Sequence, residues 1–240
     1  MATNVAEVAE GVFRLTSHVA PMDFTFCQYL VVGDESLLFH TGPLQLADDT
    51  IDAIERTIGL DALRWVSWGH AENDECGAIE RILAAAPRVE PAVGAVGTML
   101  WMGELHGRPI RTLEDDEGID LGGTTVRWID TPQVPHGWDA GLLLDERSGA
   151  LFCGDLFTVM GSHPDQTDDD LVEAAMALEY QMPGGTALTP HLARAIRALG
   201  DREPALLAPM HAPTTTTDCA GALTRLGDEY QERFQRALAG

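Results

Sequence analysis

The feature that most constrains this chain is the stretch from Trp68 to Gly77, which places His70, Glu72 and Asp74 at alternate positions. An apolar run at 63–68 precedes it, and a helix-like segment at 78–83 follows it. In extended or turning backbone, spacing by two can direct three side chains to one concave spot. One imidazole and two carboxylates in this arrangement are typical of a metal-binding loop rather than of a solvated charged face.

Three later ligand-type residues also follow predicted strands. His136 lies in the loop after the strand that ends at Asp130, Asp155 follows a strand at 150–154, and His211 follows one at 205–209. Loops at strand ends are where a rigid scaffold usually presents its chemistry. A lone His or Asp is usually structural, so the ordered set carries the prediction: three imidazoles and three carboxylates suit two divalent cations with one bridging carboxylate. The other five histidines lack such partners, and we expect them to be ordinary: His18, His40, His106, His163 and His191.

Length and composition predict one globular domain that covers residues 1–240. Hydrophobic residues make up 45% of the chain, and no apolar run approaches the ~18 to 20 residues that span a bilayer. The N-terminus has neither a basic nor an apolar signal region. We therefore expect a soluble, cytoplasmic protein.

The net charge of −23 excludes several functions, and all fifteen cations are Arg. Without Lys there is no Schiff-base chemistry and no phosphate-binding P-loop lysine. A negative field of this size argues against nucleic acid and against an anionic membrane as partners. Four scattered cysteines, with no CxxC pair, are expected to be buried thiols: Cys27, Cys76, Cys153 and Cys219.

The hydrophobic pattern predicts strands interleaved with helices. Strands are expected within 11–40 and at 63–68, 121–130, 141–145, 150–154 and 205–209, with helices at 48–58, after Glu75, at 168–179 and at 191–199. A last helix carries one apolar stripe, which we expect to pack on the sheet: Leu223, Leu226, Tyr230, Phe234 and Leu238. This α/β pattern predicts sheet on sheet with helices outside.

The order His-x-Glu-x-Asp, His, Asp, His resembles the metallo-β-lactamase superfamily, and the Glu at its second position resembles the diiron domain of the flavodiiron proteins. The likeness covers about residues 11 to 213. It includes further segments at 28–31, 120–123, 131–132, 152–157 and 207–211.

This resemblance implies a metallo-β-lactamase-like αββα sandwich that holds two iron ions (Fe²⁺/Fe³⁺). By position, His70, Glu72 and His136 would hold one iron, Asp74 and His211 the other, and Asp155 would bridge them. Zinc hydrolases of the superfamily carry His in place of Glu72, and a carboxylate there favours iron over zinc. Trp138 and Phe157 lie beside ligands and could line the pocket, although both could equally pack in the core.

Two departures from the family pattern matter. Glu75 stands where the superfamily motif usually has another His, so the second iron either has few protein ligands or uses Glu75. No flavodoxin domain follows in these residues, so we expect electrons from a separate flavoprotein or rubredoxin-like donor. Related diiron domains pair, which leaves a homodimer open.

Three functions are consistent with these residues. The first is reduction of O2, or of NO, at a diiron centre. The second is an oxygen-binding sensor that does not turn over. The third is a dinuclear zinc hydrolase of a thioester, lactone or phosphoester, against which Glu72 counts.

Overall fold

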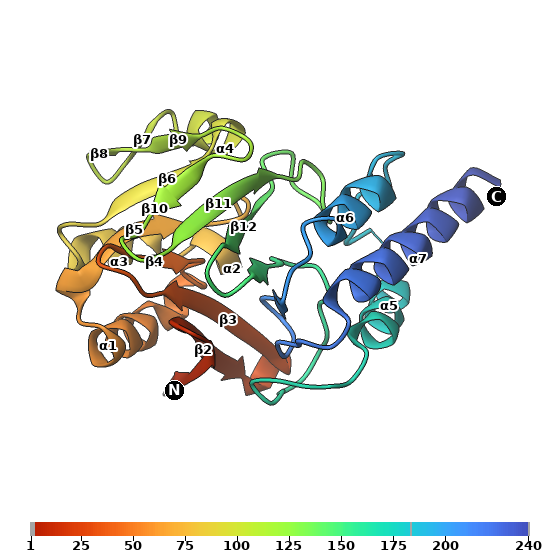
Figure 1. Ribbon diagram of the computed structural model, residues 1–240, viewed down its shortest axis with the longest axis horizontal. Coiled ribbons are helices and arrows are strands. Elements are labelled where there is room, and N and C mark those ends of the chain that lie inside the picture. Colours follow the sequence, from red (N-terminus) through yellow and green to blue (C-terminus); the bar gives the residue numbers. More distant parts are fainter. Residues whose placement is uncertain (1–2, 183, 240) are drawn as a thin grey trace.

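The computed structural model describes residues 3–182 and 184–239. Two β-sheets stack face to face, with helices on both outer sides (Figure 1). Helices α1 (Ala47–Thr57) and α3 (Ile79–Ala85) cover one side, and α5 (Leu171–Gln181), α6 (Leu192–Gly200) and α7 (Cys219–Ala239) cover the other. The predicted αββα sandwich is confirmed.

The first sheet has seven strands, in the order β1-β2-β3-β4-β5-β6-β9. They span Asn4–Ala9, Val12–Val19, Phe24–Val31, Ser36–Phe39, Leu63–Ser67, Glu90–Gly94 and Arg111–Leu113. The second sheet has five, in the order β10-β11-β12-β13-β14. These span Gly118–Asp120, Thr125–Asp130, Gly141–Asp145, Ala150–Phe152 and Leu206–Ala208. A separate antiparallel pair, β7 (Glu104–Leu105) and β8 (Arg108–Pro109), lies between β6 and β9 in the chain.

The helices follow from the strand directions. Strands β4, β5, β6 and β9 pair in parallel, and so do β13 and β14. Parallel neighbours need long crossover connections, usually helical. Helices α1 to α4 lie on the crossovers of the first sheet, and α5 and α6 lie between β13 and β14. The helices span Ala47–Thr57, Asn73–Cys76, Ile79–Ala85, Ala95–Leu100, Leu171–Gln181, Leu192–Gly200 and, for α7, Cys219–Ala239. Short 3-10 turns lie at Ala20–Met22, Leu44–Leu46 and Leu60–Ala62.

The core between the sheets also anchors the segment before His211. The ring of Phe152 lies 5.2 Å from that of Tyr29 and 5.7 Å from that of Phe39, so the two sheets meet through aromatic side chains. The buried Tyr29 hydroxyl donates to the Pro209 carbonyl at 2.7 Å. Because this bond lies two residues before His211, packing of the sheets sets where that imidazole stands.

A second apolar cluster joins α5, α6 and α7 to Leu151 and Leu207 of the second sheet. Leu223 and Leu226 of α7 are fully buried in it, as the stripe predicts. The stripe was expected to continue to Leu238, but that side chain is 73% exposed because the end of α7 extends beyond the sandwich (Figure 1).

All four cysteines are free and buried, as expected. No helix within residues 3–182 and 184–239 combines the length and apolar character that a membrane crossing requires.

Candidate metal centre

The six predicted ligand residues come together at one edge of the sandwich. His70, Glu72 and Asp74 follow β5, His136 lies in the loop between β11 and β12, Asp155 follows β13 and His211 follows β14. Their candidate ligand atoms form two groups, in each of which all atoms lie within 4.8 Å of one another. The first donor group is His70, Glu72, His136 and Asp155; the second donor group is Asp74, Asp155 and His211.

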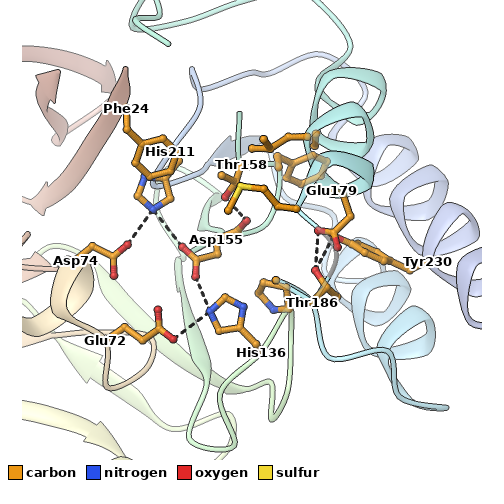
Figure 2. Close-up of a pocket in the computed structure, with 16 residues that line it drawn as sticks. Phe24, Glu72, Asp74, His136, Asp155, Thr158, Glu179, Thr186, His211 and Tyr230 are labelled. Carbon is orange, nitrogen blue, oxygen red and sulfur yellow. Dashed lines mark hydrogen bonds and ion pairs between the residues drawn. The ribbon is translucent and has the colours of Figure 1, made fainter. Parts of the chain in front are cut away.

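Asp155 is the one residue that both groups share. Its Oδ2 lies 3.3 Å from His136 Nε2 and 3.7 Å from His70 Nε2. Its Oδ1 lies 3.3 Å from His211 Nε2. One carboxylate therefore directs a separate oxygen to each group, as a bridging ligand does (Figure 2).

The other two carboxylates each belong to one group. Glu72 Oε1 lies 3.5 Å from Nε2 of both His70 and His136. Asp74 Oδ2 lies 3.3 Å from His211 Nε2. All three imidazoles thus turn the same nitrogen, Nε2, toward the carboxylates.

The second ring nitrogen, Nδ1, contacts different partners in His211 and in His70. His211 Nδ1 lies 2.7 Å from the Thr25 carbonyl oxygen, which requires the hydrogen on Nδ1 and leaves Nε2 free to bind a metal. The ring of Phe24 stacks on His211 with 4.3 Å between ring centres. His70 Nδ1 instead lies 3.1 Å from Glu75 Oε1, a charged partner.

Two glycines allow this close packing. A Cβ at Gly69 would lie 2.8 Å from Glu75 Oε2 and 2.9 Å from the Gly141 carbonyl oxygen. Gly137 has φ +81° and lies against the His70 ring, where an added Cβ would lie 3.0 Å from Cδ2. Only glycine meets both the conformational and the steric demand at Gly137.

Without bound metal, neighbouring carboxylates raise the pKa of His70 and of His211. Burial lowers the pKa of His70, but Glu75, Glu72 and Asp155 outweigh it and raise that pKa to about 11. Burial likewise lowers the pKa of His211, and the Asp155 and Asp74 carboxylates raise it to about 9. Burial raises the pKa of Asp155, whereas His211 and the other imidazoles pull it well below its usual range. A cation at this site would replace protons on these two imidazoles.

The three further residues predicted for the pocket lie in different places. Phe157 is buried and lines the cavity beside the two donor groups. The expectation for Trp138 is not met: its side chain is 53% exposed and does not line the cavity, because the chain turns at Gly137. Glu75 is 1% exposed and lies behind His70, away from the second donor group, which therefore has three members.

The cavity has a polar far wall that the sequence did not reveal. It has a volume of about 230 Å³ and is lined by every member of the two donor groups except His70, and by residues of α5 and α7. Glu179 of α5 accepts hydrogen bonds from Thr186 at 2.8 Å and from Tyr230 of α7 at 3.2 Å, opposite the predicted ligands (Figure 2). Arg233, which is 11% exposed, pairs with Glu179. The sequence pattern predicts Tyr230 only as part of the apolar stripe, because its spacing fits that stripe.

Comparison with known families gives a match over residues 24–212, to the model described as ODP family beta lactamase. The chain belongs to this family. The matched range begins with β3 and ends just after His211, so this ODP-family domain contains all six predicted ligand residues.

Individual relatives are distant, and this chain spans less than two fifths of the length of the oxidases that it matches. The chain is 26% identical over 160 residues to a coenzyme F420H(2) oxidase of Methanothermobacter marburgensis, which is 62% of this chain but 38% of that oxidase. The fold matches a fragment of putative diflavin flavoprotein A 5 of Nostoc sp. with a TM-score of 0.79 and 16% identity, covering 100% of this chain and 99% of the fragment. It also matches rubredoxin oxygen:oxidoreductase of Desulfovibrio gigas with a TM-score of 0.77 and 17% identity, covering 97% of this chain and 62% of that one.

Proposed function

We propose that the first and second donor groups each hold one iron ion, with Asp155 between them, and that this centre binds and reduces O2, with NO as a second substrate. The observation that carries the proposal is the pair of groups sharing a single carboxylate. The residues fit iron because His and carboxylate donors are mixed at both positions, with no thiolate among them. The names of the two oxidoreductases among the relatives support the same chemistry.

Two bound irons would supply electrons to a small ligand at their open positions. The chain's own residues hold the pair together and shape the space beside it. Phe24 and Phe157 give the cavity apolar walls, which admit a small uncharged molecule such as O2. The first donor group has four members and the second three, so both leave positions free of protein ligands.

Reduction of O2 to water consumes four electrons and four protons. We propose that the electrons come from a flavoprotein or rubredoxin-like module outside residues 1–240. The hydroxyls of Thr186 and Tyr230 donate to Glu179, so the far wall of the cavity holds ordered polar groups beside the space that O2 would occupy.

The deciding experiment is anaerobic purification with metal analysis, followed by O2 uptake in the presence of a chemical reductant. About two irons per chain and continuous O2 consumption are expected. Binding of O2 that stops at one equivalent would favour the sensor. A protein that holds two zinc ions and is indifferent to O2 would contradict the proposal in favour of the hydrolase.

A further inference from the structure

Glu75 occupies an unusual place for a charged side chain. It follows Asp74 directly in α2, yet it is 1% exposed and faces the interior of the sandwich. Its Oε2 accepts the backbone N–H of His70 at 2.5 Å, and its Oε1 lies 3.1 Å from His70 Nδ1. A buried carboxylate is costly unless its partners compensate. Both of these contacts go to the same residue, so Glu75 holds the backbone and the ring of His70 together.

Behind Glu75 lies a second buried histidine. His40 is 1% exposed, and its Nε2 lies 3.4 Å from Glu75 Oε1. Its φ of +64° is uncommon for a residue with a side chain. Its backbone N–H donates to the Ser67 carbonyl at the end of β5, and its ring packs on Phe39. The fold therefore keeps a buried imidazole, carried by a residue with left-handed backbone, next to a buried carboxylate.

The three histidines of the candidate metal centre differ in the partner of Nδ1. Burial leaves His136 Nδ1 without a hydrogen-bond partner, and His211 Nδ1 meets a neutral carbonyl. Among the three, His70 alone has an anionic neighbour at Nδ1. A carboxylate behind a ligating imidazole fixes its tautomer and orientation and makes the ring more basic. The first donor group also has one member more than the second.

We propose that Glu75, backed by His40, is a positioning residue that holds His70 with Nε2 toward the metal, so that the first donor group binds its ion more tightly than the second. This inference rests on the proposed function, because it takes both groups to be metal positions. In this inference Glu75 contacts the ligand His70 and binds neither metal ion directly.

The test is a titration of the metal-free protein with Co²⁺ alone under anaerobic conditions, followed by visible absorption. The unaltered protein is expected to take up two ions in two separate steps. In Glu75→Gln the tighter step weakens by about 10- to 100-fold, the usual cost of losing such an outer partner, and the weaker step stays where it was. His40→Gln weakens the same step by a smaller factor, and it carries the test if Glu75→Gln does not fold.

The matched control is Asp145→Asn. Asp145 is another fully buried carboxylate, bonded to Thr124 and Ser148 at the end of β12 that is remote from the His136 loop. Its loss should leave both steps unchanged. If Glu75→Gln and His40→Gln titrate like the unaltered protein, or weaken the second step, the positioning role is refuted while the proposed function stands. If the unaltered protein takes up no Co²⁺, both fall.

Discussion

Asp155 offers the sharpest test of the metal centre because it is the one member common to both donor groups. Asp155→Asn keeps the size of the side chain but removes the charge that faces His136 and His211 at 3.3 Å. We therefore expect this variant to lose metal from both positions. Variants in Glu72 or Asp74, which belong to one group each, should lose one metal and keep the other.

The magnitude follows from the place of Asp155 in the site. Losing an outer partner of a metal ligand already costs about 10- to 100-fold in affinity. A residue that contacts the metal should cost at least about 100-fold, or about 2.7 kcal/mol, at each position. Since Asp155 serves two positions, the combined loss is about 10⁴-fold, or about 5.5 kcal/mol.

The assay is metal content per chain after anaerobic loading with Fe²⁺ and dialysis. The expected values are about two for the unaltered protein, about one for Glu72→Gln and for Asp74→Asn, and near zero for Asp155→Asn. Circular dichroism of each variant checks that the sandwich is intact. If Asp155→Asn retains two irons, or loses no more than Glu72→Gln does, Asp155 is not shared and the assignment of the centre is refuted.

Four further outcomes are expected. In the metal-free protein the pKa values of His70 and His211 are about 11 and about 9, above the unfolded value of about 6.5. The stability that these two protonated imidazoles contribute is therefore complete below about pH 6.5 and is lost as pH rises through 9 to 11. A melting temperature that does not fall over that range would contradict this. Metal binding should show the opposite trend and weaken as pH falls, because protons compete for the same nitrogens; titrations at pH 6 and pH 8 check it. Gly69→Ala should lower the free energy of unfolding by about 1 to 3 kcal/mol, because its Cβ would lie 2.9 Å from the Gly141 carbonyl oxygen; urea unfolding measures this, and an unchanged midpoint would contradict it. Tyr230→Phe should cost about 0.5 to 1.5 kcal/mol for the lost hydrogen bond and leave metal content intact, as unfolding and metal analysis would show; loss of metal would place Tyr230 closer to the ions than the structure does.

The sequence by itself determined the local part of the candidate metal centre. His70, Glu72 and Asp74 fall within five residues directly after a strand, so their nearness follows from the chain alone. Strand patterns likewise placed Asp155 and His211 at strand ends, where the sandwich has to bring them to one edge.

The tertiary structure decided which way neighbouring side chains point and what lies across the cavity. Asp74 and Glu75 are adjacent in α2, where each residue turns by about 100°, so one faces His211 and the other the core behind His70. The contact between Glu179 and Tyr230 joins residues 51 positions apart. No local pattern encodes such a contact, because it depends on how α5 and α7 pack against the second sheet.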